Sequence, residues 1–82
     1  QLLKYYFNYF FELNKNLDFK NFNDAYNNAY KIRELAILAG VDQIVNCLDE
    51  MIVMIKEKKV KQTQALLDQI NVSFESYRKQ VL

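Results

Sequence analysis

The sequence predicts an all-α protein: one domain, residues 1–82, folded as an antiparallel up-down-up-down four-helix bundle. Two observations predict this fold. Apolar residues recur at alternating spacings of three and four in four separate segments, which is the period of a helix, and strand-like alternation never persists. The chain has no proline and one glycine, so it contains few residues that favour tight turns. Four helices in so short a chain leave only short connections, which place consecutive helices antiparallel.

The first helix is expected at about residues 2–17. The apolar stripe that defines it consists of Leu3, Tyr6, Phe10, Leu13 and Leu17. Further aromatic residues lie off this stripe, so the helix is apolar nearly all round. We expect either that Phe7 and Phe11 form a self-association surface or that segments outside this chain cover them. In the polar loop that follows, Asp18 or Asn21 is expected to cap the second helix.

The second helix is expected at about residues 22–39. Its stripe is Phe22, Ala25, Ala29, Ile32, Ala36 and Ala39. Four of these residues are alanines, so another helix can approach closely along this seam. Gly40 follows directly and predicts the end of the helix, because glycine adopts the left-handed conformation at little cost.

The third and fourth helices are expected at about residues 42–58 and 63–81. The stripe of the third is Val41, Ile44, Leu48, Met51 and Ile55. The stripe of the fourth is Leu67, Ile70, Phe74, Tyr77 and Val81. Thr63 is expected to cap the fourth helix. The lysine-rich run between the two helices has the composition of a solvated loop.

The composition excludes several classes of function. The absence of histidine removes histidine acid–base catalysis, most zinc sites and phosphohistidine chemistry. We therefore expect a protein that is not an enzyme and holds no metal and no cofactor. Eleven basic and ten acidic residues give a net charge of +1, so we expect no nucleic-acid partner. No apolar run is long enough to span a membrane, and no membrane partner is expected.

The single cysteine and the first residue bear on where the protein works. Cys47 cannot form an internal disulfide, which favours a reducing compartment, the cytoplasm. Its place on the flank of the third helix is typical of a small buried hydrophobic residue. Because the chain begins with Gln1 and not with Met, we expect it to be excised from a longer protein.

The second helix offers a candidate binding face away from its core stripe. At 100° per residue, Tyr30 falls on the solvent side, among polar residues. Tyr26, Arg33 and Ile37 lie on the flank between Tyr30 and the core, and Leu38 lands on the polar side. Exposed tyrosines are common, so this geometry alone does not establish a site.

The stretch from Ala29 to the C-terminus resembles the histidine-containing phosphotransfer (HPt) domain. That family is a four-helix bundle that relays phosphoryl groups to and from the receiver domains of two-component signalling. Its motif reads Ala-His-x-Leu-Lys-Gly, and a further Gly follows ten positions after the His. The positions here that match it in character and spacing are Ala29, Ile32, Arg33, Ala36 and Gly40. The resemblance implies an HPt-like bundle.

Two departures from the HPt motif bear directly on its chemistry. Tyr30 stands where the family has its phosphoaccepting histidine, and a phenol cannot form the phosphoramidate that makes the relay reversible. Glu34 stands where the family has the Gly that leaves room for the receiver domain, and a carboxylate there repels a phosphoryl group. The resemblance therefore implies a pseudo-phosphotransfer domain that has kept the bundle and lost the reaction.

The leading hypothesis is a non-catalytic signalling and protein-interaction module. It docks a partner such as a receiver domain through Tyr26, Tyr30, Arg33, Glu34 and Ile37. Tyrosine and arginine suit this role because they bury a large area and keep a polar end. The alternative is a structural or oligomerising bundle, a homodimer formed through Phe7 and Phe11, with no role in two-component signalling.

Overall fold

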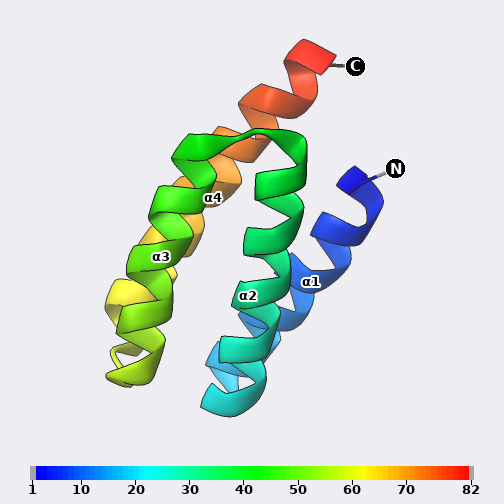
Figure 1. Cartoon of the computed structure of the whole chain (residues 1–82). Helices are drawn as coiled ribbons and strands as arrows, with labels where there is room; N and C mark the ends of the chain where they lie inside the picture. The colour runs from blue at the N-terminus through cyan, green and yellow to red at the C-terminus, as the bar shows by residue number, and fades with distance from the viewer. Residues whose placement is uncertain (1, 82) are drawn as a thin grey trace.

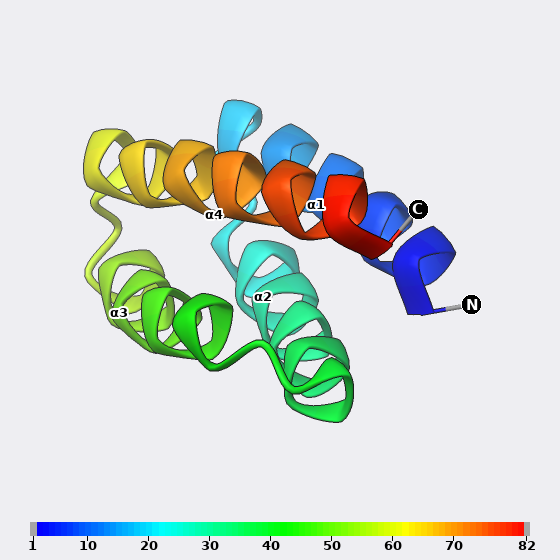
Figure 2. The same cartoon turned by 90° about the horizontal axis from the view of Figure 1, so that it is seen from above.

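A computed structural model describes residues 2–81, and the side chains of residues 5 and 7–76 within them. These residues form four helices, α1 (Leu2–Asp18), α2 (Phe22–Ala39), α3 (Asp42–Lys56) and α4 (Val60–Val81). Consecutive helices run in opposite directions, so that both ends of the chain lie at the same end of the bundle as the α2–α3 turn (Figures 1 and 2). The predicted antiparallel four-helix architecture is confirmed.

The core is built from the predicted stripes of all four helices. Each helix contributes side chains that are 5% exposed or less, such as Leu13, Ile32, Leu48 and Ile70. The three alanines buried in α2 are Ala25, Ala29 and Ala36. Because these side chains are short, α2 packs closely against its neighbours α1 and α3. The predictions for Leu3, Tyr6, Tyr77 and Val81 lie outside the described side chains.

An aromatic contact joins the first helix to the last. The ring of Phe7 meets the ring of Phe74 edge to face, with centroids 5.3 Å apart and planes at 84°. This is the favoured geometry for two aromatic rings, whose positive edges lie against negative faces. Consecutive helices pack along their length, whereas α1 and α4 touch over a shorter stretch. The Phe7–Phe74 pair therefore helps to close the bundle.

All three connections use one backbone device, the Schellman motif. Lys20, Gly40 and Lys58 adopt left-handed conformations, with φ of 56°, 73° and 59°. At each turn the left-handed residue donates its N–H to the carbonyl three residues earlier, at 3.0–3.1 Å, and the next residue donates to the carbonyl five residues earlier, at 2.8–3.0 Å. The prediction that Gly40 ends α2 is confirmed, and two lysines do the same for α1 and α3.

The prediction of Asn21 as the N-cap residue of the second helix is confirmed in position, but the expected side-chain capping hydrogen bond is not formed. Asn21 occupies the N-cap position of α2 but makes no side-chain capping bond. Its Nδ2 donates instead to Asp24 Oδ2 at 2.7 Å. Asp18, the alternative, is the last residue of α1.

The expected boundaries of the third and fourth helices are wrong by two and three residues. The third helix ends at Lys56, not Lys58, because the left-handed Lys58 reverses the chain. The fourth begins at Val60, so Thr63 is already helical and is not its N-cap. Thr63 is fully buried, and its Oγ1 donates to the carbonyl of Lys59 at 2.7 Å. A hydroxyl bonded to the backbone four residues earlier is the usual arrangement for a threonine inside a helix.

Substitution at the left-handed glycine and at the two left-handed lysines should change the free energy of unfolding in opposite directions. A left-handed conformation costs a residue with a Cβ roughly 1–2 kcal/mol. Gly40→Ala should therefore lower the free energy of unfolding by about 1 kcal/mol; its Cβ would meet no atom within 4 Å, so the loss is one of backbone conformation alone. Lys20→Gly and Lys58→Gly should each raise it by about 0.5–1 kcal/mol. Urea denaturation measures all three. As a control, Lys31→Gly, inside α2, should destabilise by about 1 kcal/mol. If Lys20→Gly and Lys58→Gly both lowered the free energy of unfolding, the left-handed conformation would not be a strain on these lysines.

Candidate functional site

The candidate binding face lies on α2 and consists of Tyr26, Tyr30, Arg33, Glu34 and Ile37; we call it the Tyr30 face. Tyr30 is 39% exposed and Ile37 is 50% exposed, while Tyr26 and Arg33 are half-buried. The rings of Tyr26 and Tyr30 pack against each other, with centroids 4.9 Å apart and planes at 61°. The helical spacing thus brings the five residues to one side of α2, with Tyr26 supporting the more exposed Tyr30.

The packing of α3 against α2 adds residues that the sequence argument missed. Arg33 Nε donates to Asp49 Oδ1 at 2.6 Å, so the guanidinium is tied to α3 and does not extend freely into solvent. Lys56 Nζ lies 5.2 Å from the centre of the Tyr26 ring. Val53, which lies between these two α3 residues in sequence, is 51% exposed. The Tyr30 face is therefore flanked by an acid, an apolar side chain and a base from the neighbouring helix.

The sequence did contain a signal for these pairs. Arg33 and Asp49 each lie eight residues from Val41, and Tyr26 and Lys56 each lie fifteen residues from it. In an antiparallel helix hairpin that turns at Val41, residues at equal distances from the turn lie at the same level. Comparing the distances of residues in the two helices from Val41 would therefore have predicted that Arg33 pairs with Asp49 and Tyr26 with Lys56.

The pKa values of the two tyrosine hydroxyls are shifted in opposite directions. The pKa of Tyr26 is lowered from 10.0, first by a side-chain hydrogen bond with Tyr30 and also by Lys56. The pKa of Tyr30 is raised from 10.0 by the same hydrogen bond and by the charge that Tyr26 would carry. One shared hydrogen bond explains both directions. Tyr30 donates to and stabilises the Tyr26 phenolate, and once Tyr26 is ionised, loss of the Tyr30 proton would place two negative charges side by side. Tyr26 is thus the tyrosine of the pair that ionises first.

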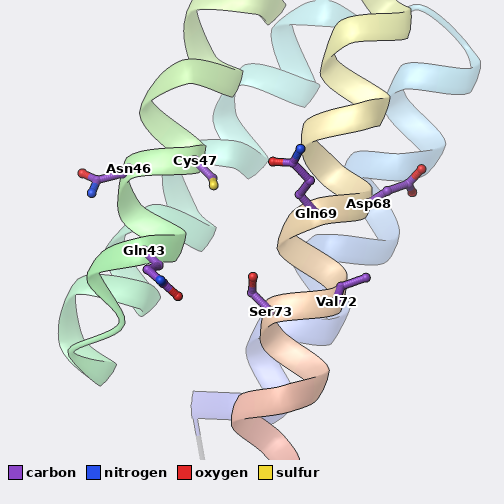
Figure 3. A pocket seen from close by; sticks show the side chains of 7 residues that line it. All are labelled: Gln43, Asn46, Cys47, Asp68, Gln69, Val72 and Ser73. Atoms are coloured by element: carbon purple, nitrogen blue, oxygen red, sulfur yellow. The ribbon is translucent and has the colours of Figure 1, made fainter.

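A hollow on the described surface lies away from the Tyr30 face, between α3 and α4 (Figure 3). It is an open groove of about 650 Å³, lined by Gln43, Asn46, Cys47, Asp68, Gln69, Val72 and Ser73. Cys47 and Gln69 point into it, whereas Asn46 and Asp68 point away (Figure 3). Cys47 packs half-buried against the core, which is less burial than the sequence predicts. Within the described residues no group of three acidic or thiol side chains could hold a metal ion.

The two aromatic residues considered for self-association differ in their surroundings. Phe7 is half-buried and packs against the core and Phe74. Phe11 is 66% exposed. Only Phe11 is therefore placed to meet another molecule without disturbing the fold.

No protein-family model, curated protein or solved structure matches this chain significantly. The resemblance of the stretch from Ala29 to the C-terminus to HPt domains therefore stays a prediction from the sequence. None of the helices over residues 2–81 combines the length and the apolar character that crossing a membrane requires.

The coupling of the two tyrosines can be measured directly. In Tyr30→Phe the pKa of Tyr26 should rise toward 10.0, because the hydrogen bond that favours its phenolate is gone. In Tyr26→Phe the pKa of Tyr30 should fall toward 10.0. NMR titration of protein labelled at the tyrosine ring carbon that bears oxygen resolves each residue. Tyr5→Phe, on α1, is the control and should leave both values unchanged; unchanged values in the two pair variants would mean that the hydroxyls do not interact.

Proposed function

We propose that this protein is a non-catalytic signalling module with an HPt-like bundle, which docks a receiver domain or similar protein through the Tyr30 face. A module of this kind would act in the cytoplasm. The observation that carries the proposal is the placement of Tyr30: it occupies the motif position of the phosphoaccepting histidine and is exposed on the outside of α2. The position is accessible to a partner, but its side chain cannot carry the phosphoryl relay.

The chemistry of Tyr30 supports docking and not transfer. A tyrosine phenol is protonated and a poor nucleophile near neutral pH, and Tyr26 raises the pKa of Tyr30 further above its ordinary value. Glu34, one turn later and exposed, adds a negative charge beside the position where a phosphoryl group would arrive. A protonated phenol remains able to donate and accept hydrogen bonds across an interface.

The Tyr30 face is also preorganised for binding. The Tyr26 ring supports Tyr30, and the bond from Arg33 to Asp49 holds the guanidinium in one place. Side chains that are already ordered lose little conformational entropy when a partner binds. Ile37 and Val53 add exposed apolar area. Aromatic and arginine side chains with apolar neighbours are the usual composition of an interface hot spot.

Titration of isotope-labelled protein with receiver domains from the same genome tests the proposal. Amide shifts should concentrate at Tyr30, Arg33 and Ile37, and Tyr30→Ala should weaken binding at least tenfold, the effect of removing a hot-spot aromatic. Phe11→Ala is the matched control, since Phe11 is an exposed aromatic on a different helix. Shifts confined to another face, or equal losses in the two variants, would refute docking through Tyr30.

A second candidate function is self-association through α1. It is favoured by the exposure of Phe11, 66%, and of Tyr5, 55%, on the aromatic first helix. Large exposed apolar side chains often mark contacts between copies of a protein.

Sedimentation velocity over a range of concentrations distinguishes this candidate. If α1 forms a homodimer, Phe11→Asp should abolish a concentration-dependent dimer while the helical circular dichroism stays unchanged. Phe7→Asp is unsuitable here because Phe7 packs against Phe74 in the core. Glu34→Ala, on the Tyr30 face, should leave the dimer intact. A wild-type protein that remains monomeric at all concentrations excludes this function.

A further inference from the structure

The two hairpin turns that join α1 to α2 and α3 to α4 lie together at one end of the bundle (Figure 1). Lys58, in the second turn, places its Nζ 6.0 Å from the ring centre of Phe22, at the start of α2, so the two turns are neighbours. We call this end the basic end. Its charged residues, from the last turn of one helix to the first turn of the next, are Lys15, Asp18, Lys20, Asp24, Lys56, Glu57, Lys58, Lys59 and Lys61.

The charges of the chain are segregated along the bundle. Six of the eleven basic residues lie at the basic end, with only three of the ten acidic residues. The basic end therefore carries +3 and the remainder of the chain carries −2, which together give the net charge of +1. A nearly neutral chain thus presents a positive surface to a partner that approaches from this end.

Two lysines at the basic end adopt a strained backbone conformation. Among the described residues, Lys20 and Lys58 are the only ones other than glycine with positive φ, and both lie at this end. The turn at the opposite end has the same geometry and uses Gly40. Glycine would remove the strain at both lysine positions. A residue held in a costly conformation where a cheaper one exists is a sign of function.

An exposed aromatic side chain stands among these lysines. Phe19, directly before Lys20, is 76% exposed, more than any other large hydrophobic side chain described. Nothing in the packing of the bundle accounts for it, because Phe19 is in the turn and does not pack on the core. Among the described side chains, the most exposed large apolar group and the cluster of lysines therefore occupy the same end of the bundle.

We propose that the basic end docks on an anionic membrane surface, with Phe19 inserted at the interface and the lysines above it paired with lipid headgroups. A ring exposed at one end of the bundle can enter a flat, deformable surface, which needs no preformed pocket to receive it. Lysines supply point charges on long flexible stems, which keep their ammonium groups at the headgroup level while the apolar part reaches inward. This site adjoins the Tyr30 face at Lys56, which lies over the Tyr26 ring, and it does not include Tyr30 itself. Docking in this way directs the long axis of the bundle away from the membrane.

The strained lysines allow a test in which stability and binding change in opposite directions. The doubly substituted Lys20→Gly, Lys58→Gly protein should be more stable than wild type. It should nevertheless partition about 25-fold less onto vesicles of 70% phosphatidylcholine and 30% phosphatidylserine, because each surface lysine contributes about fivefold. Lys31→Gln is the matched control: Lys31 is an exposed lysine that also lies over an aromatic ring, Tyr9, but on the side of the bundle. It should lower partitioning less than either turn lysine alone.

Insertion of residue 19 can be followed by fluorescence, because the protein contains no tryptophan of its own. The emission of Phe19→Trp should shift to the blue on these vesicles and be quenched by brominated lipid, and neither should occur on pure phosphatidylcholine. Phe11→Trp, an exposed aromatic away from the basic end, should show neither effect. Absence of binding at low salt, equal binding to neutral vesicles, or stronger binding to DNA or polyglutamate than to the anionic vesicles would overturn the proposal.

Discussion

The left-handed residue that ends each of the first three helices is the constraint on which the rest of the structure depends. A helix leaves its last carbonyls without partners, and in a chain without proline and with one glycine the Schellman motif satisfies them three times. Because each motif reverses the chain within a few residues, consecutive helices must run antiparallel. The turn at Gly40 also sets the level of α3 against α2, and this level brings Arg33 to Asp49 and Lys56 to Tyr26.

The small residues of α2 explain how one helix serves both the core and a candidate site. Ala25, Ala29 and Ala36 let neighbouring helices approach closely on one side, so little of the helix surface is needed for packing. Larger side chains, among them Tyr30 and Ile37, remain on the outer side. Tyr30 thereby places a bulky aromatic group with a polar hydroxyl on the surface of the helix.

The topology also gives the bundle two different ends. An up-down-up-down chain places its first and third turns together and its second turn with the termini. Lysines from segments about forty residues apart are therefore gathered at one end, while Gly40 lies at the other. The Tyr30 face lies on the side of the bundle and the basic end at its tip, and the two adjoin at Lys56, whose ammonium lies over the Tyr26 ring.

The sequence by itself determined the number of helices, their order, most of the core and the end of α2, because helical periodicity and the conformational freedom of Gly40 are local properties. It also placed Tyr30 outside the core. Only the tertiary structure decided which residues of other helices meet this face, because cross-helix contacts depend on where each turn reverses the chain. Thr63 illustrates the limit: its type favours a cap, but a left-handed Lys58 starts the helix earlier and buries it. The positive end was likewise hidden in a net charge of +1, because a sum over the chain carries no information about position.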